Sequence, residues 1–133
     1  MKYNSVMALT ALDLSPEELK KYRPREFLRK RKAERRAEVA ARRRRALRLA
    51  RKAAKLLKEK FGAKEVLLFG SLARRGGFTR FSDIDLAVRG VKDYLAAMDA
   101  VLYMSPEFKI DLVDLDFCLP ALRAEAEREG KPL

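Results

Sequence analysis

Two aspartates at alternate positions carry the clearest chemistry in the sequence. Asp83 and Asp85 lie in an apolar run that has the length and composition of a β-strand. Because alternate side chains of a strand share a face, the two carboxylates should point the same way, about 6 to 7 Å apart. The two carboxylates repel each other unless a cation is close, and ligation by oxygen atoms favours Mg²⁺ or Mn²⁺. The pair predicts a divalent-metal site, and a solvated strand end is the alternative.

A third acid follows 28 residues after Asp83, in the predicted strand Lys109–Leu115. Asp111 alternates with apolar neighbours there, so it should take the opposite face from them. If the two strands are neighbours, Asp111 joins the pair, and three carboxylates can hold two ions about 4 Å apart, as in phosphoryl displacement. Asp114 and Asp116 are alternative third acids, but Asp114 falls on the apolar side near the strand end, where a loop-facing acid is the simpler account.

A glycine and a serine end the preceding apolar run, Glu65–Phe69, which is also a predicted strand. Glycine lets the backbone approach a phosphate closely, so Gly70 could contact one directly. The hydroxyl of Ser71 and nearby amide groups could hold the phosphate oxygens where a helix starts. A Gly-Ser pair after a strand is more often an ordinary turn, so its meaning depends on the aspartates that follow.

Together these motifs resemble the signature of the DNA polymerase β nucleotidyltransferase superfamily, and most closely its minimal nucleotidyltransferases. The resemblance runs roughly from Val66 to Asp116, and three motifs in the right order are far more specific than any one of them. One departure is a loop of eleven residues between Ser71 and Asp83, one residue longer than is common in the group. A surface loop tolerates such an insertion well.

The resemblance implies a fold, an activity and a partner. Gly70, Ser71 and Arg74 would contact the triphosphate of ATP, although the doubled arginines in the longer loop leave open which of them does so. The three aspartates would bind two Mg²⁺ ions, and Asp111 would also take the proton from an acceptor hydroxyl that receives AMP. Minimal members typically act as antitoxins of all-helical HEPN toxins, and some adenylylate a tyrosine of that partner. Neutralisation by binding alone is the alternative.

Periodicity and turn residues predict the elements that must position these side chains. The predicted elements after Gly62 are strands at Glu65–Phe69, Asp83–Val88 and Lys109–Leu115, a helix at Val91–Met104, and a terminal helix at Pro120–Glu129 closed by Gly130. This order predicts an α/β (α+β) core over residues 62–133, with helices flanking a small mixed sheet.

Residues 1–61 are predicted to form a helical arm. A capping box at Ser15 predicts a short helix over residues 15–22, while residues 1–14 have no clear period. No Gly or Pro lies between Pro24 and Gly62, so one long helix over residues 25–61 is allowed. Its second half should pack on the core through a stripe of small and apolar residues: Ala46, Leu49, Ala50, Ala53, Leu56 and Leu57. The first half, with Arg42–Arg45, should project or pair with another chain.

Basic charge is concentrated in this arm. From Lys20 to Lys60 there are 20 basic and 4 acidic residues, whereas the rest of the chain carries a net charge of −4. Such an arm could bind nucleic-acid phosphates, Arg42–Arg45 among the candidates, but no aromatic residue lies between Leu28 and Lys60 for base stacking. The alternative is a solvated helix used for self-association, as in a homo-oligomer, or for docking an acidic partner.

The amino-acid composition restricts which residues can bind a metal ion and indicates a cellular compartment. The single cysteine, Cys118, excludes an internal disulfide, and the absence of histidine means that a metal site must use carboxylates. No run approaches the roughly 20 apolar residues that span a bilayer. We therefore expect no membrane span and a reducing, cytoplasmic location.

Overall fold

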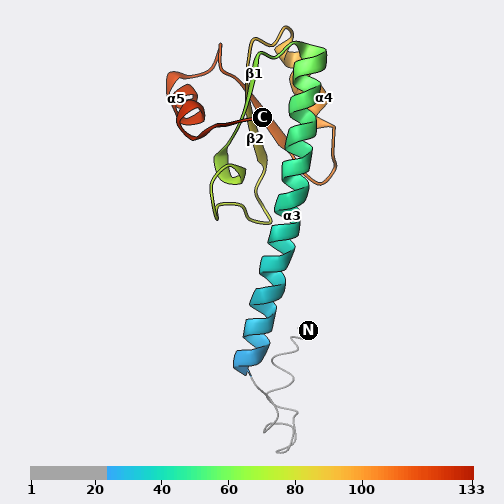
Figure 1. Cartoon of the computed structure of the whole chain (residues 1–133), viewed down its shortest axis with the longest axis vertical. Helices are drawn as coiled ribbons and strands as arrows, with labels where there is room; N and C mark the ends of the chain where they lie inside the picture. The colour runs from blue at the N-terminus through green and yellow to red at the C-terminus, as the bar shows by residue number, and fades with distance from the viewer. Residues whose placement is uncertain (1–23) are drawn as a thin grey trace, which may run out of the picture. The chain divides into compact units, whose positions relative to one another are not determined.

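The computed structural model describes residues 24–133, so the predictions for residues 1–14 and 15–22 lie outside the described residues. The elements in chain order are helix α3 (Pro24–Phe61), strand β1 (Glu65–Phe69), 3₁₀ turn η1 (Gly70–Leu72), β2 (Ile84–Arg89), α4 (Tyr94–Leu102), β3 (Ile110–Asp114), α5 (Pro120–Glu129) and β4 (Lys131–Pro132) (Figure 1). The chain divides into two compact units, Met1–Ala37 and Glu38–Leu133.

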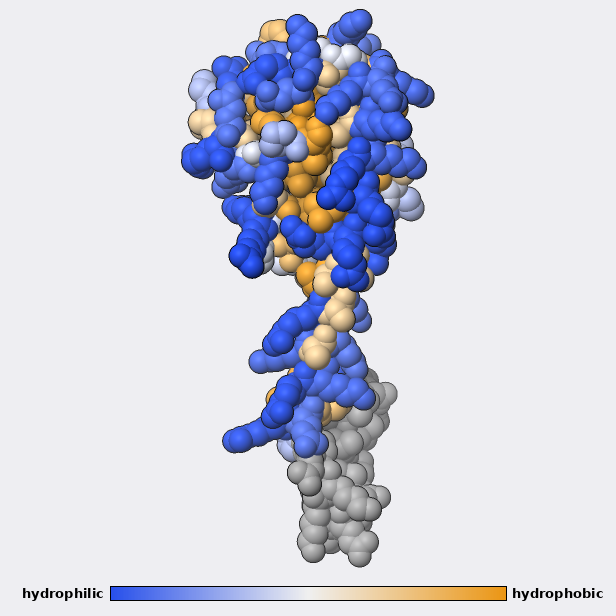
Figure 2. Space-filling view, in the orientation of Figure 1, coloured by the Kyte–Doolittle hydropathy of each residue, from blue (hydrophilic) through white to orange (hydrophobic). Residues whose placement is uncertain are grey.

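The described part of the first unit is the start of α3. Pro24 takes the first helical position, where its fixed backbone angle suits a helix and its missing N–H costs nothing. Every side chain from residue 24 to residue 37 is exposed, and the surface of this stretch is mostly hydrophilic (Figure 2). Among its few apolar residues, Phe27 lies below the guanidinium of Arg31, at 5.7 Å from the ring centroid. The described residues of this unit therefore bury no apolar face.

The second unit is built on a four-stranded mixed sheet in the order β3-β2-β1-β4. Strand β1 runs antiparallel to both β2 and β4, whereas β2 and β3 are parallel. Because parallel neighbours need a crossover connection, α4 joins β2 to β3. The predicted small mixed sheet with flanking helices is confirmed, as is the long N-terminal helix.

The structure corrects several predicted bounds. Strand β2 begins at Ile84, one residue after Asp83, and α4 is shorter than the predicted Val91–Met104. The Asp93 side chain caps α4 by accepting from the Ala96 backbone N–H at 3.1 Å, which sets its start. Strand β4 was not predicted from the sequence. It has two residues, one of them a proline, and it forms only by pairing with β1.

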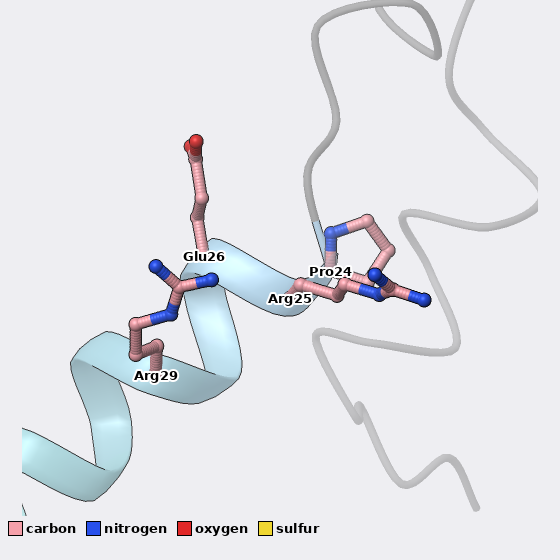
Figure 3. A pocket seen from close by; sticks show the side chains of 4 residues that line it. All are labelled: Pro24, Arg25, Glu26 and Arg29. Carbon is pink, nitrogen blue, oxygen red and sulfur yellow. The ribbon is translucent and has the colours of Figure 1, made fainter.

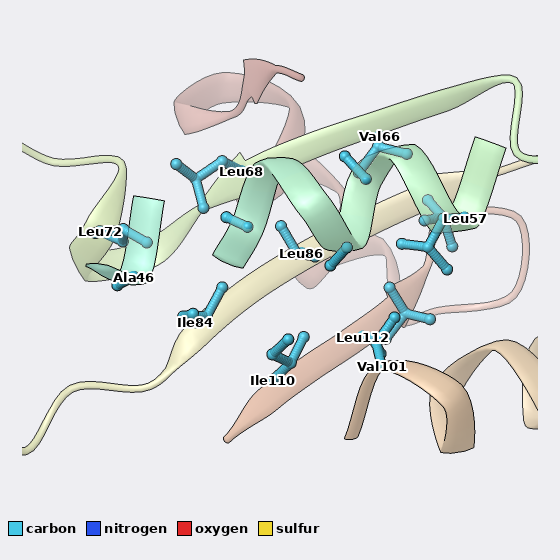
Figure 4. Close-up of a cluster of buried hydrophobic side chains, with 14 of the residues drawn as sticks. Ala46, Leu57, Val66, Leu68, Leu72, Ile84, Leu86, Val101, Ile110 and Leu112 are labelled. Atoms are coloured by element: carbon cyan, nitrogen blue, oxygen red, sulfur yellow. The ribbon is translucent and has the colours of Figure 1, made fainter. Parts of the chain in front are cut away.

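Two helices cover one face of the sheet. The buried residues of α3 are mostly alanines, Ala46, Ala50, Ala53 and Ala54, together with Leu57, and they form a single cluster with the apolar residues of the strands and of α4 (Figure 4). Small residues let the helix backbone approach the sheet closely. The predicted packing of the second half of the helix on the core is thus confirmed, although Leu49 and Leu56 are only partly buried.

Helix α5 covers the opposite face (Figure 1). Its Ala126 is buried against Leu67 and Phe69 of β1 and Ala87 of β2. Because strand side chains alternate, Asp85 and Asp111 belong to this α5 face, and their apolar neighbours face α3. Both aspartates therefore lie on the face that α5 covers, opposite α3 and α4. Among the described residues, no helix has the length and hydropathy needed to cross a membrane.

The arginine run of α3 does not project from the second unit as predicted. The guanidinium of Arg43 donates to the backbone oxygen of Leu72 at 3.3 Å, and that of Arg45 donates to Glu107 at 2.7 and 2.9 Å. Arg42 is still more enclosed, with 17% of its side chain exposed. Three of the four arginines make contacts within the unit, which corrects the prediction that this run projects from the core.

Candidate active site

The pairing of β2 with its two neighbours brings the predicted residues together at Asp85. This residue lies opposite Phe69 of β1 and opposite Asp111 of β3. Adjacent strands are about 4.8 Å apart, and residues in register on a parallel pair share a face. Asp85 and Asp111 are therefore neighbours on the α5 face of the sheet, as the alternation of the two runs predicts.

Asp83 lies just outside the strand ladder. It is exposed, and it follows a loop in which the Ser82 hydroxyl accepts from the Thr79 backbone N–H at 2.9 Å. The loop is also held by the Thr79 hydroxyl, which accepts from the Phe81 N–H at 3.2 Å. Asp83 is close enough to Asp85 to raise the pKa of its carboxyl. It thus joins the site from the loop rather than from the strand.

The charge at Asp85 is poorly compensated. Its pKa is raised from the ordinary 3.8 to about 6, first by burial and then by the charges of Asp111, Asp83 and Glu125, while Arg74 acts in the opposite direction. A carboxyl in such surroundings is stabilised by any added cation. The electrostatics of the site therefore favour a positively charged ligand.

The donor set fits a metal ion that arrives with a nucleotide. Within residues 24–133, no three acidic or thiol side chains are grouped closely enough to hold an ion by themselves. Mg²⁺ usually takes one or two protein carboxylates together with substrate phosphates, and does not need an all-protein cage. Asp85 and Asp111, with Asp83 nearby, supply such a partial set.

Gly70 lies directly against the Asp85 carboxylate. Its φ is +75°, and a Cβ atom at this position would come within 2.2 Å of the Asp85 Oδ2. A side chain is therefore excluded both by backbone conformation and by space. The carbonyl of Gly70 accepts from the N–H groups of Ala73 and Arg74, at 3.1 and 3.2 Å, so the turn that contains Ser71 starts beside Asp85. The turn that carries the Gly-Ser motif therefore lies against Asp85.

Helix α5 adds acidic residues that were not predicted as part of the site. Glu125 raises the pKa of Asp85, and Glu129, one turn later, lies 3.9 Å from the Arg74 guanidinium. The second carboxylate oxygen of Glu129 is buried without a hydrogen-bond partner. The i, i+4 spacing of the two glutamates on a predicted helix was a signal that they share a face, but the packing of that face could not be read from it.

The alternative third acids lie elsewhere. Asp114 is in register with Val88, three residues along the ladder from Asp85, which is about 10 Å away. Its carboxylate accepts from the Asp116 N–H at 3.0 Å, and that of Asp116 accepts from the Gly90 N–H at 3.0 Å. Both carboxylates therefore accept backbone hydrogen bonds around the turn after β3. Asp111 is the acid that β3 brings to Asp85.

Two hollows in the described residues do not include the aspartates. One, of about 500 Å³, is bordered by Pro24, Arg25, Glu26 and Arg29 in the first turns of α3 (Figure 3). The other, of about 530 Å³, is lined by residues of α3, β1, η1 and the C-terminal segment, among them Leu47, Leu72 and Leu133. The aspartate site is accessible from solvent at Asp111, whose side chain is 44% exposed.

Comparison with known proteins identifies the family. Residues 51–133 match the family model described as "Polymerase beta, Nucleotidyltransferase". The chain belongs to the polymerase beta nucleotidyltransferase family. Nucleotidyltransferase activity is the activity of this family, and the matched range includes every residue of the site described above. No curated protein matches the chain in sequence.

Solved structures add a likeness to toxin–antitoxin systems. A toxin–antitoxin structure with AMP-PNP is 29% identical over 62% of this nucleotidyltransferase and 70% of the other chain, with a TM-score of 0.53. Two mutants of the toxin–antitoxin MntA–HpeT match with TM-scores of 0.51, at 29% and 26% identity, over 62% of this chain and 69% and 70% of theirs. These matches confirm the resemblance to minimal nucleotidyltransferases that the motifs indicated.

The contact between Gly70 and Asp85 leads to a first prediction. We expect Gly70→Ala to lower the free energy of unfolding by about 1–3 kcal/mol more than Gly76→Ala, since the added methyl group overpacks the site. Gly76 is a matched control because its φ is also +75° but nothing lies within 4 Å of its Cβ position. Urea unfolding of both variants measures the difference. Equal losses would show that only backbone strain matters at Gly70.

The raised pKa of Asp85 leads to a second prediction. The folded state holds the proton up to about pH 6 and the unfolded state only to about 3.8, so the carboxyl lowers stability as the pH rises between these values. With metal removed by EDTA, Asp85→Asn should be more stable than wild type above pH 6, on the order of 1–2 kcal/mol after allowance for solvent screening. The advantage should disappear towards pH 4.

Denaturant unfolding at pH 8 and pH 4 measures this effect. Asp99→Asn makes the same chemical change at an exposed position of α4 and should alter stability little at either pH. An Asp85→Asn variant that is less stable than wild type at pH 8 would contradict the charge repulsion described for this site.

Proposed function

We propose that this nucleotidyltransferase transfers AMP from ATP to an acceptor hydroxyl with the help of Mg²⁺. The observation that carries the proposal is the register of Asp85 with Asp111 on adjacent strands, with the backbone of Gly70 packed against the Asp85 carboxylate. A phosphate that approaches Gly70 closely would therefore reach Asp85, whose charge is poorly compensated, and its neighbour Asp111, which has the Lys109 Nζ atom at 3.4 Å. The proposed site would thus combine a turn that can approach phosphate with carboxylates that can share an ion with it.

Each side chain of the site would have its own role in the reaction. Ser71 would donate its hydroxyl to a phosphate oxygen, and Arg74 would leave its exposed, 3.9 Å contact with Glu129 to neutralise the triphosphate. Asp83, Asp85 and Asp111 would hold the metal ions, which when bound neutralise phosphate charge and make the acceptor hydroxyl easier to ionise.

Asp111 would accept the acceptor's proton. It lies on the edge strand β3 and is partly exposed, so an incoming hydroxyl can reach it. As the acceptor oxygen bonds to the α-phosphorus, the bond from that phosphorus to the bridging oxygen breaks and pyrophosphate leaves. The chain has no histidine that could serve as the base instead.

We further propose that the acceptor is a tyrosine of a HEPN-type toxin, which this chain neutralises as an antitoxin. The support is the motif resemblance to minimal nucleotidyltransferases and the likeness to toxin–antitoxin structures, one of them with AMP-PNP. The exposed position of Asp111 is compatible with a protein side chain as acceptor. Neutralisation by binding alone remains the second candidate, because the exposed basic turns at the start of α3 offer a contact surface that the chemistry does not need.

Label transfer tests the proposal. The chain is incubated with Mg²⁺, ATP labelled at the α-phosphate, and the toxin encoded beside it, and incorporation into the toxin is followed. We expect Asp85→Asn and Asp111→Asn each to reduce the rate by roughly 10²–10⁴-fold, since each removes a group that acts in the transition state. Asp116→Asn, in the turn after β3, should change the rate little. Transfer that persists in both site variants would reject the mechanism.

A further inference from the structure

Arg42 is a charged side chain in an enclosed position on α3. Only 17% of the side chain is exposed. Its guanidinium lies 4.3 Å from the ring centroid of Phe108 and 5.8 Å from that of Phe78, so one aromatic face is in close contact and a second is nearby. Contact with ring faces stabilises a guanidinium that has lost much of its water. The charge is therefore accommodated by aromatic residues of two separate loops.

The polar contacts of Arg42 connect the same two loops. One terminal nitrogen donates to the backbone oxygen of Ser82 at 3.3 Å, and the other lies 3.6 Å from the Glu107 carboxylate. The Nε atom is buried without a hydrogen-bond partner. A planar guanidinium can reach two groups at once because its donors form a rigid fork. Arg42 thus links the loop that contains Phe78 and Ser82 to the loop that contains Glu107 and Phe108.

These loops lead directly into the two strands of the site. Ser82 immediately precedes Asp83, and Phe108 is three residues before Asp111. Between the loops, the backbone N–H of Ile84 donates to the oxygen of Lys109 at 3.0 Å, where the parallel pairing of β2 and β3 starts. Arg42 therefore contacts the chain just before the first rung of the ladder that sets Asp85 opposite Asp111.

Stability alone does not account for an arginine at this position. Removing a guanidinium from water is costly, and the unpartnered Nε leaves part of that cost without compensation. Replacement of buried ionic groups by apolar side chains of similar size is often neutral or stabilising. A methionine could fill the space between the two rings, but it could not hold the Ser82 oxygen and the Glu107 carboxylate together.

We propose that Arg42 is a positioning residue for the aspartate site. By linking both loops, it fixes the approach of Asp83 and Asp111 to Asp85, so that the carboxylates are held in place before an ion or nucleotide arrives. The inference rests on the proposed function, because the geometry that Arg42 maintains is that of the proposed metal–nucleotide site. It extends the site into α3, from which no residue was predicted to act on the aspartates.

Two measurements on the whole chain test the inference. The first is the affinity for Mn²⁺ in the presence of AMP-PNP, followed by electron paramagnetic resonance. The second is hydrogen exchange of the Ile84 amide in metal-free protein, which reports the first rung of the ladder without any ligand. We expect Arg42→Met to weaken Mn²⁺ binding about tenfold or more, as removal of groups that orient metal ligands commonly does, and to speed Ile84 exchange.

Control variants separate positioning from other effects. Arg45→Met removes a guanidinium that also contacts Glu107, but from the exposed surface, so it should leave Mn²⁺ affinity within about twofold of wild type. Arg44→Met removes an exposed arginine of the same helix and should behave in the same way. Arg42→Lys keeps the charge without the fork and should still weaken binding by about threefold or more.

The outcomes separate a failure of the positioning role of Arg42 from a failure of the proposed function. The inference is overturned if Arg42→Met binds Mn²⁺ with wild-type affinity and its Ile84 amide exchanges at the wild-type rate. This holds even if the variant melts at a lower temperature. If Arg42→Met does not fold, Arg42→Lys decides, and wild-type affinity in that variant also overturns the inference. Failure of the wild type to bind Mn²⁺ with AMP-PNP would instead reject the proposed function, and the positioning role with it.

Discussion

The structure of the site depends on the placement of like charges side by side in one sheet. Pairing β2 with β3 in parallel register puts Asp85 next to Asp111, and burial together with the charges of neighbouring acids raises the pKa of Asp85 to about 6. This arrangement opposes folding, so apolar packing elsewhere must offset it. The α3 face of the sheet supplies that packing, because the neighbours of both aspartates, Ile84, Leu86, Ile110 and Leu112, are buried there.

The strands and the carboxylate pair could be predicted from the sequence because they depend on local alternation. A period of two in the runs around Asp85 and Asp111 determines which residues share a face, and the strand lengths limit how the runs can pair. The order of the three motifs along the chain then supported the family resemblance. The α3 stripe was predictable for the same reason, since its small residues recur at helical spacing.

Long-range contacts could not be predicted in this way. Strand β4 has no strand pattern of its own and exists only through pairing with β1. The role of Arg42 depends on two loops about 40 and 65 residues later in the chain, which no local period encodes. The same holds for Glu125 and Glu129, whose relation to Asp85 follows from how α5 packs. The charge of the arginine run therefore predicted exposed side chains. In the structure, three of the four arginines form hydrogen bonds with later parts of the chain.

The central claim is that Asp85 and Asp111 bind a nucleotide through a shared divalent ion. Isothermal titration calorimetry with AMP-PNP, with and without Mg²⁺, tests it most directly, in the wild type and in Asp111→Asn. The account predicts binding that requires Mg²⁺ and that is lost or weakened at least tenfold in the variant. Binding of equal strength without Mg²⁺, or an unchanged affinity in Asp111→Asn, would contradict it.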